Sequence, residues 1–365
     1  MPLSIGIVGL PNVGKSTLFN ALTEKSVPAE NFPFCTIDPS VGIVAVPDHR
    51  LNKLSDFSKS KKTIPAAVEF VDIAGLVAGA SKGEGLGNKF LANIREVDVI
   101  AHVVRVFDNP NVVHVHGEIN PKEDIGIINL ELVMADAETV SKRLESIEKE
   151  VRRNVKGAKE EKEMLTKLSN HLELGKLVNQ LELTDEENVL QKGLHLLTSK
   201  PMLYILNRQS DGANLDETNN EKFRECIEHI ESLGSRYVQV DASVEQELTS
   251  VAHEEKDELR RELNTSPDNI DALIKTGYEM LDLITFFTTG IDETRGWTIK
   301  RDSTAPEAGA VIHTDFKDKF IRADVIPWDT LLEIGSYATA REKGLIKTVG
   351  KDYIVNDGDV IEFKI

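Results

Sequence analysis

The first part of the chain alternates short apolar runs with glycine-rich turns and helical stretches. The runs lie at residues 4–8, 67–71 and 97–106, and similar ones return at 201–206 and 237–240. Short apolar runs separated by helical segments are typical of a parallel sheet with crossover helices, whose strands are buried on both faces. The pattern therefore predicts an α/β fold with a mostly parallel sheet that is interrupted and then resumes.

The interruption has the pattern of a polar helical segment, from about residue 131 to residue 200. Its apolar residues recur at spacings of three and four on both sides of a polar break at 154–158, as in amphipathic helices. They are Val140, Leu144, Ile147, Val151, Leu165, Leu168 and Leu172. We predict two helices that fold back on each other as an antiparallel arm. A solvated arm and an arm that binds a partner are both open interpretations.

From about residue 283 the pattern changes to short strand-like runs that are broken by turn residues. The runs and one helical stretch lie at 296–299, 310–312, 320–326, 351–355 and 360–363, and at 328–343. This mixture predicts a small separate α+β module. The expected units are a first domain at 1–130 and 201–282, an inserted arm at 131–200, and a C-terminal module at 283–365.

Composition narrows the class of protein. The chain has 61 acidic and 43 basic residues, and its formal net charge of -18 disfavours broad nonspecific binding to nucleic acid. Its 2 cysteines, Cys35 and Cys226, support neither a disulfide framework nor a cysteine-rich metal cluster. No run approaches the roughly 20 apolar residues of a membrane span, and no apolar signal segment opens the chain. We expect a cytoplasmic protein without a membrane partner.

A glycine-rich loop follows the first apolar run. Residues 9–16 read Gly-Leu-Pro-Asn-Val-Gly-Lys-Ser and match the pattern G-x-x-x-x-G-K-[ST] at every fixed position, between a strand and a helical run. In such a P-loop the backbone N–H groups and the helix N-terminus face phosphates, the lysine neutralises their charge, and the serine hydroxyl binds Mg²⁺. The residues expected at a nucleotide are Asn12, Val13, Gly14, Lys15, Ser16 and Thr17, with Lys15 also catalytic.

A second motif lies at the end of a later strand. Asp72 ends the run at 67–71, and Gly75 follows three residues later. In P-loop enzymes an aspartate in this place holds Mg²⁺ through water, and the glycine N–H senses the γ-phosphate. Thr36 lies in the loop between the two motifs, where its hydroxyl would complete the metal shell when triphosphate is bound. We therefore expect Ser16, Thr36 and Asp72 as metal ligands and Gly75 as a catalytic contact.

Together these motifs carry a resemblance to a known family. The segments 6–17, 31–36, 70–89 and 312–316 resemble those of the YchF-type Obg-like ATPases, and the resemblance covers essentially the whole chain. It implies a P-loop domain related to translation factors, an inserted antiparallel helical arm, and a C-terminal β-grasp module of the TGS type. It also implies that ATP is the nucleotide and that the partner is the ribosome or a translation-associated ribonucleoprotein.

The residues after the run at 201–206 bear on the choice of purine. Guanine-specific relatives carry Asn-Lys-x-Asp here, whereas this chain has Asn207, Arg208, Gln209 and Ser210. A serine hydroxyl cannot replace a carboxylate that accepts two hydrogen bonds from guanine, so guanine selection should be poor. The family's usual Asn-x-x-Glu, associated with ATP, is also absent, and the neighbouring Asp211 keeps GTP open as an alternative. By resemblance, Asn207 and Arg208 are the expected base-side residues, with the adenine amine near the Arg208 backbone.

The motifs leave the group that orients the attacking water unassigned. Leu76 stands where many GTPases have a glutamine, so intrinsic hydrolysis should be slow. His114 follows the strand at 97–106 and is our catalytic candidate, with an ordinary surface histidine as the alternative. His102 lies within that apolar strand and is expected to be buried. By similarity to potassium-stimulated relatives, Asn12 is expected to help bind K⁺ beside the phosphates.

The residues and the resemblance favour an Mg²⁺-dependent ATPase that acts as a conformational switch with slow turnover. One alternative is a GTPase switch of the same fold, which competition between ATP and GTP would distinguish. The other is an RNA-binding adaptor that nucleotide regulates with negligible hydrolysis. That adaptor would bind ATP tightly and release no phosphate, even with ribosomes present.

Overall fold

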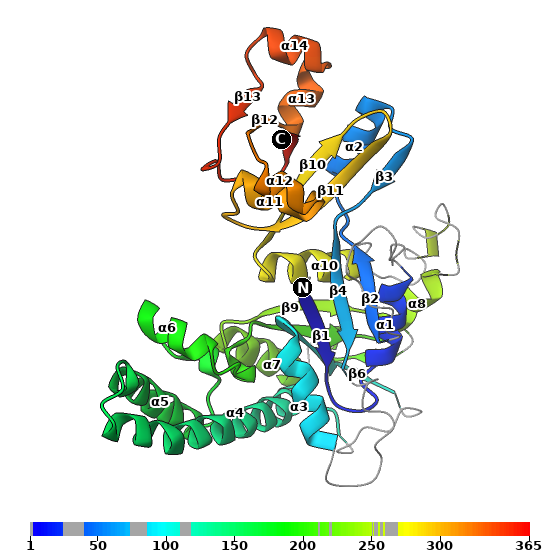
Figure 1. Cartoon of the computed structure of the whole chain (residues 1–365). Coiled ribbons are helices and arrows are strands. Elements are labelled where there is room, and N and C mark those ends of the chain that lie inside the picture. Colours follow the sequence, from blue (N-terminus) through cyan, green and yellow to red (C-terminus); the bar gives the residue numbers. More distant parts are fainter. Residues whose placement is uncertain are drawn as a thin grey trace.

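A computed structural model gives the fold of the chain (Figure 1). The structure describes residues 3–24, 40–73, 86–109, 118–210, 212–218, 221–249, 251, 255, 258–259 and 269–365, with the backbone alone at 86–89. The strands among these residues form two six-stranded sheets and one two-stranded sheet. No helix within the same residues is long and apolar enough to cross a membrane.

The first sheet contains the strands expected from the apolar runs. Its order is β2-β4-β1-β5-β7-β9, and all neighbours are parallel except β2, which runs antiparallel to β4. The strands are β1 Ser4–Val8, β2 Val41–Ala45, β4 Ala67–Asp72, β5 Val99–Arg105, β7 Met202–Asn207 and β9 Arg236–Val240. Every residue of β1, β5 and β7 is buried, which explains their unbroken apolar runs. The mostly parallel α/β sheet is thus confirmed.

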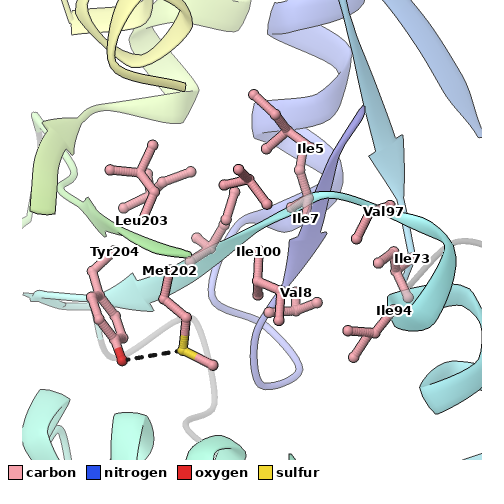
Figure 2. Packing of buried hydrophobic residues seen from close by; sticks show 14 of the residues in the cluster. Ile5, Ile7, Val8, Ile73, Ile94, Val97, Ile100, Met202, Leu203 and Tyr204 are labelled. Atoms are coloured by element: carbon pink, nitrogen blue, oxygen red, sulfur yellow. Dashed lines mark hydrogen bonds between the residues drawn. The ribbon is translucent and has the colours of Figure 1, made fainter. Parts of the chain in front are cut away.

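Helices pack on both faces of this sheet. They are α1 Lys15–Thr23, α3 Leu86–Glu96, α4 Pro121–Arg152, α7 Glu221–Ser232, α8 Ala242–Thr249 and α10 Asn269–Met280. On one face Gly277 of α10 lies against Ile5, where a Cβ would come within 2.5 Å. On the other face the Asn129 amide of α4 donates to the Tyr204 hydroxyl at 3.2 Å. Figure 2 shows the alternation along β7, with Leu203 on the opposite side from Tyr204.

The inserted arm is confirmed as an antiparallel helical hairpin. Helix α4 runs out from the sheet, and α5, Ala158–Glu173, returns beside it (Figure 1). The turn between them contains Asn154 and Gly157, both with positive φ. The Arg143 guanidinium of α4 binds the Glu161 carboxylate of α5 at 2.6 Å, which ties the two helices together.

Helix α4 begins earlier than the expected start of the arm at residue 131. It starts at Pro121 and is capped by the Asn120 side chain. Its first turns are buried in the core of the first sheet through Ile125 and Ile128. The arm is therefore an extension of a helix that belongs to the sheet, and the polar pattern marks only the part that leaves it.

Short elements return the chain from the arm to β7, and Asp136 of α4 anchors the last of them. They are η3 Val178–Gln180, α6 Asp185–Lys192 and η4 Leu197–Ser199. The Asp136 carboxylate accepts from the Leu197 N–H at 2.8 Å, and from the N–H and hydroxyl of Thr198 at 2.8 and 2.7 Å. The root of the arm is therefore held by a buried acceptor.

The second sheet lies in the C-terminal part of the chain and confirms the expected β-grasp module. Its order is β13-β12-β14-β10-β11-β3. Its C-terminal strands are β10 Leu283–Thr289, β11 Glu293–Lys300, β12 Arg322–Pro327, β13 Lys347–Val349 and β14 Asp359–Lys364. The helices that accompany them are α11 Ala305–Ile312, α12 Thr314–Asp318, α13 Trp328–Ile334 and α14 Tyr337–Glu342. The helical stretch expected at 328–343 is confirmed, with Gly335 separating α13 from α14.

Two of the strands expected in this module are not strands. Residues 310–312 form the end of α11, because Thr304 and Glu307 make a capping box that starts a helix here. Residues 351–355 contribute a single bridge, between Thr304 and Ile354. Both runs are too short for their period to distinguish a strand from another structure.

One segment of the N-terminal part belongs to the second sheet. Helix α2, His49–Ser58, and strand β3, Lys62–Ile64, lie between β2 and β4 in sequence, and β3 pairs in parallel with β11. Leu51 and Leu54 of α2 pack with Phe287 of β10. Figure 1 shows α2 and β3 beside β10 and β11, away from the first sheet. The expected boundaries of a first domain and a C-terminal module do not include this excursion, and the division into units stays a prediction.

Candidate nucleotide-binding site

The phosphate loop leaves β1 and enters α1 at the carboxyl edge of the first sheet. Gly9 and Gly14 have φ of 148° and 96°. A Cβ on Gly9 would lie 2.5 Å from the Val103 carbonyl oxygen, and one on Gly14 would lie 2.3 Å from the Asn207 amide nitrogen. Glycine is therefore required at both positions, for its positive φ and for the close approach.

The N-terminus of α1 is suited to an anion. Gly14 is its N-cap residue and has no side chain that could bond the first N–H groups of the helix. These donors remain available to an external acceptor, and the helix dipole adds to the attraction for negative charge. This arrangement is the one that a P-loop uses for phosphate.

Lys15 and Asp72 lie within electrostatic range of each other at this edge. The Lys15 ammonium donates to the Leu10 carbonyl within the loop. Burial lowers the pKa of Lys15, and the nearby charge of Asp72 opposes that shift. Asp72 ends β4 and is buried. The structure thus brings together the lysine expected at phosphates and the aspartate expected near Mg²⁺.

The remaining loop residues differ in what they offer to a ligand. Asn12 and Ser16 have exposed side chains, and Thr17 is half-buried. Val13 is buried in the core, so only its main chain can face a nucleotide. A serine hydroxyl and an aspartate carboxylate are hard oxygen donors of the kind that Mg²⁺ prefers, so Ser16 and Asp72 fit this ion.

The Asn207 side chain is committed to the protein. Its amide nitrogen donates to the Val13 carbonyl at 2.8 Å, and its amide oxygen accepts from the Ala242 N–H at 3.1 Å. Asn207 therefore holds the phosphate loop to the segment that follows β9. Its expected contact with a nucleotide stays a prediction about its main chain.

Arg208 and its neighbours form a braced loop. The Arg208 N–H donates to the Val240 carbonyl at 2.8 Å, and its guanidinium pairs with Asp216 at 3.1 Å and with Glu217. The main chain of Gln209 exchanges two hydrogen bonds with the side chain of Asn214, at 3.0 and 2.9 Å. A two-stranded ladder of β6, Phe107–Asp108, and β8, Ala213–Asn214, holds the loop further. These bonds hold the described residues of this loop in place.

Asp241 is bonded to the loop that follows β7, and the sequence motifs did not reveal it. It is 3% exposed, and its carboxylate accepts from the N–H groups of Ser243 at 3.1 Å and Val244 at 3.0 Å, and from that of Ser210. Burial raises the pKa of Asp241. Its position directly after the strand at 237–240 and before a helix is an N-cap pattern, which was the available signal.

His102 is buried, as expected. Neither ring nitrogen has a hydrogen-bond partner, and the ring lies 5.5 Å from that of Tyr204. Burial, and secondarily the charge of Lys15, lowers the pKa of His102 to about 3, so the ring is neutral at physiological pH.

Several expected site residues lie outside the described residues. They are Thr36, Gly75, Leu76, His114 and Asp211. The structure therefore leaves untested the third metal ligand, the γ-phosphate contact, the candidate catalytic histidine and the second carboxylate near the base.

Comparison with known proteins covers the whole chain. Residues 4–149 match a family model described as "50S ribosome-binding GTPase", and residues 283–365 match one described as "Protein of unknown function (DUF933)". The "Ribosome-binding ATPase YchF" of Bacillus subtilis (strain 168) is 48% identical over 364 residues, which cover 100% of this chain and 99% of that protein. The protein of the same name from Escherichia coli O157:H7 is 46% identical over 363 residues, with the same coverage.

A solved structure shares the fold. The "Structure of the Schizosaccharomyces pombe YchF GTPase" superposes with a TM-score of 0.88 at 37% identity, and the match covers 100% of this chain and 98% of that one. The printed names of these similar proteins differ on the nucleotide, ATP in one case and GTP in the other.

Proposed function

Because this chain belongs to the YchF family, we propose that it is an ATP-binding and ATP-hydrolysing molecular switch, dependent on Mg²⁺, that associates with the ribosome. The observation that carries the proposal is the phosphate loop, with the uncapped start of α1 and the neighbouring Lys15 and Asp72 at one sheet edge. As a nucleoside triphosphate hydrolase of this family, the protein works in the cytoplasm, where its ribosomal partner is found.

Each polar residue of the phosphate loop has its own proposed contact with the triphosphate or its cations. The first N–H groups of α1 and the Lys15 ammonium bind the phosphate oxygens, after Lys15 exchanges its Leu10 carbonyl for a phosphate. Ser16 and Asp72 hold Mg²⁺, which when bound neutralises charge on the β- and γ-phosphates. Thr36 is proposed as a further ligand of this ion. We also propose that the exposed Asn12 side chain helps to bind K⁺.

The described residues favour adenine over guanine. Recognition of guanine needs a carboxylate that is free to accept two hydrogen bonds. Asp241 lies beside Ser210, but its oxygens already accept from three main-chain N–H groups. Adenine instead would be met by the backbone near Arg208, whose loop is already braced. The GTPase alternative depends on Asp211, and the test below decides between them.

We expect slow turnover because of the residue that follows Gly75, the proposed contact of the γ-phosphate. Leu76 carries no group that could orient a water molecule, so the triphosphate state persists after binding. We propose that Gly75 contacts the γ-phosphate and that His114 orients the water when a rearrangement or a partner brings it inward. A long-lived ATP state is what a switch requires, because its partner must meet that state before hydrolysis ends it.

The fold offers a route by which this state can reach the second sheet. Strand β4 ends at Asp72 and, at its other end, connects to β3 and α2 in the second sheet. At that junction the Arg50 guanidinium binds Asp48 at 2.7 Å and Asp357 at 2.6 Å, and Asp357 also accepts from the Thr285 N–H at 2.9 Å. Movement at the nucleotide would thereby reach the C-terminal module through the continuous chain and through the contacts of Arg50 and Asp357.

Nucleotide competition tests the proposal. A fluorescent ATP analogue is displaced by unlabelled ATP or GTP, and phosphate release is followed with and without ribosomes. We expect ATP to compete at least about tenfold better than GTP, because Asp241 is not free to accept the two hydrogen bonds that guanine donates. Lys15→Ala should weaken ATP binding by about 10- to 100-fold through loss of a charge-assisted contact. Lys275→Ala, at an exposed lysine of α10, should not.

The outcomes separate the alternatives. Tighter binding of GTP would replace ATPase with GTPase. Tight ATP binding with no phosphate release, even with ribosomes, would favour the regulated adaptor. Equal binding by Lys15→Ala and the unmodified protein would show that the site has been placed wrongly.

A further inference from the structure

The turn that joins α4 to α5 carries a cluster of positive charge. Residues 149–159, which we call the arm tip, contain five basic residues and one acidic residue, in a chain whose formal net charge is -18. Figure 1 shows this turn at the end of the arm that lies away from both sheets. The basic residues are all exposed, and they are Lys149, Arg152, Arg153, Lys156 and Lys159. The arm tip is therefore a protruding basic surface on an acidic protein.

Carboxylates next to the arm tip are held by basic residues of the arm itself. Arg143 binds Glu150 at 2.8 Å and Glu161 at 2.6 Å, and Lys162 binds Glu148 at 3.1 Å. Glu150 is the one acidic residue of the arm tip, and its carboxylate is therefore engaged below the turn.

Most cations of the arm tip have no such partner. Arg152 reaches Glu148 at 3.5 Å, and the other four make no ion pair with any residue that the structure describes. One unpaired carboxylate, that of Glu160, borders the arm tip in sequence, and those of Glu145 and Glu163 lie about one helical turn further down the arm. The arm tip thus presents four unpaired cations beside a single bordering carboxylate.

The fold explains only part of this cluster. Lys149 and Arg152 lie in the last turn of α4, where positive charge complements the negative end of the helix dipole. Lys156 comes directly before Gly157, the N-cap residue of α5, and Lys159 lies in the first turn of that helix. A helix N-terminus repels positive charge, so both lysines are unfavourable for the stability of α5. A local cost of this kind is expected where residues serve binding.

The main chain of the arm tip forms a defined turn. Asn154 and Gly157 have φ of 54° and 85°. The Val155 N–H donates to the Glu150 carbonyl at 3.1 Å, and the Ala158 N–H donates to the Val155 carbonyl at 3.2 Å. The basic side chains thus start from a main chain that is already ordered, which lowers the entropy lost when a ligand binds them.

The composition of the arm tip distinguishes between kinds of partner. Protein interfaces have a buried core with aromatic residues, whereas lysine and arginine suffice to bind a nucleic-acid backbone. Residues 149–159 contain no aromatic residue, and Val155, which is 47% exposed, is their only exposed large hydrophobic residue. The arm tip therefore fits a row of phosphate groups better than it fits an acidic protein.

We propose that the arm tip binds the phosphate backbone of RNA. Its four unpaired cations bind phosphate oxygens, and these contacts involve no base, so binding tolerates any sequence and weakens steeply with salt. The negative charge of the remaining chain repels RNA and confines the contact to the arm tip. That this RNA is ribosomal rests on the proposed association with the ribosome.

Binding of a fluorescein-labelled RNA hairpin and of purified ribosomes to the full chain tests this proposal. The tip variant replaces the four unpaired cations, as Lys149→Gln, Arg153→Gln, Lys156→Gln and Lys159→Gln. The control variant makes the same change of charge at exposed residues elsewhere, as Lys176→Gln, Lys192→Gln, Lys275→Gln and Arg322→Gln. Melting temperature and ATP binding show that both variants are folded.

The tip variant should bind the hairpin about tenfold or more weakly at moderate salt, and the control variant should bind it as the unmodified protein does. The slope of log affinity against log salt concentration should become less steep by about three in the tip variant, at roughly 0.7 to 0.9 for each lost phosphate contact. Co-sedimentation with ribosomes should fall in the tip variant alone.

The outcomes separate this proposal from the proposed function. Equal affinity of the tip variant and the unmodified protein for the hairpin, or an equal loss in the control variant, would overturn the proposal. Undiminished ribosome binding by the tip variant would overturn the assignment to ribosomal RNA. If the tip variant loses the hairpin but the unmodified protein does not bind ribosomes, the RNA contact stands and the ribosomal association fails. Binding of labelled polyglutamate, with no binding of the hairpin, would assign the arm tip to an acidic protein instead.

Discussion

The two sheets of this protein use parallel strands in different ways. In the first sheet β5 and β7 pair over six residues and β7 and β9 over five, and every residue of β5 and β7 is buried. In the second, β10 and β14 share a single pair. A complete ladder closes the space between strands, so the site lies beyond their carboxyl ends, as in other open α/β sheets. An incomplete ladder leaves space between the strands themselves.

The comparison shows that the two sheets end their central parallel strands differently. The first sheet has a complete ladder that ends beside a helix N-terminus and Lys15, and the second ends its parallel pairing after Phe287 and Val360. The link between the two is the excursion through α2 and β3, which leaves the first sheet and completes the edge of the second. Variants at each place should therefore separate the contributions of the two sheets.

The largest effect on stability is expected at Asn207 in the first sheet. Asn207→Leu leaves the Val13 carbonyl and the Ala242 N–H buried without their partner, which should lower the free energy of unfolding by about 2 to 5 kcal/mol. ATP affinity should fall with it, since the phosphate loop loses its brace. Urea unfolding measures the first effect and calorimetric titration the second. Asn170→Leu, at an exposed position of α5, is the control, and an equal loss there would contradict this account.

A smaller loss is expected where the two sheets join. The Arg50 side chain is 16% exposed, and Arg50→Met removes the partner of Asp48 and Asp357. This substitution should lower the free energy of unfolding by about 1 to 3 kcal/mol. Arg301→Met breaks a pair with Asp282 in which both side chains are largely exposed, and should cost well under about 1 kcal/mol. Urea unfolding ranks the two variants. The reverse order would show that the junction is not held by Arg50.

Hydrogen exchange should register the difference between the two ladders directly. The Phe363 N–H lies beyond Phe287 and Val360, the single residue pair that joins β10 to β14, whereas amides within β5 and β7 lie in a complete ladder. We expect Phe363 to exchange at least about tenfold faster than Val104 or Leu206, since local opening costs it no strand pairing. Amide-resolved exchange by NMR measures this. Equal protection would mean that the second sheet closes in solution.

The smallest effect concerns pH and Asp241. Burial raises the pKa of this carboxyl in the folded protein above its ordinary value of 3.8. At pH values between 3.8 and the raised pKa, the folded state therefore binds more protons than the unfolded state. The contribution of Asp241 to stability therefore falls as pH rises through that window and is constant above it. Asp241→Asn should remove this slope, measured by urea unfolding between about pH 3.5 and pH 6.5. A slope of opposite sign in the difference between the two proteins would contradict the assignment.

Much of the fold followed from short-range patterns. The buried strands gave unbroken apolar runs, and the phosphate loop combined a fixed motif with a strand before it and a helix after it. The excursion of α2 and β3 could not be predicted in this way, because β3 pairs with β11 across more than 200 residues of sequence. The sequence of residues 310–312 is compatible with either a strand or a helix. The capping box of Thr304 and Glu307, which starts α11, is the signal that favours the helix.

The candidate site was predictable where chemistry sets the residue type. A lysine, a hydroxyl and a carboxylate at fixed positions are needed for phosphate and metal, so Lys15, Ser16 and Asp72 stand out. The supports of the site are harder to find, since Asn207 and Asp241 act through main-chain groups that many side chains could serve. Such residues become visible only when the fold shows which N–H and carbonyl groups they satisfy.

The central claim is that ATP at the first sheet is sensed by the second through α2 and β3. Hydrogen exchange of residues 49–64 in the full chain tests it most directly, with Mg²⁺ and a non-hydrolysable ATP analogue, with ADP, and without nucleotide. We expect slower exchange in this segment with the ATP analogue than with ADP, and no such difference in Lys15→Ala. If the analogue binds and the exchange of residues 49–64 is the same in all three states, the two sheets are not coupled and the claim is wrong.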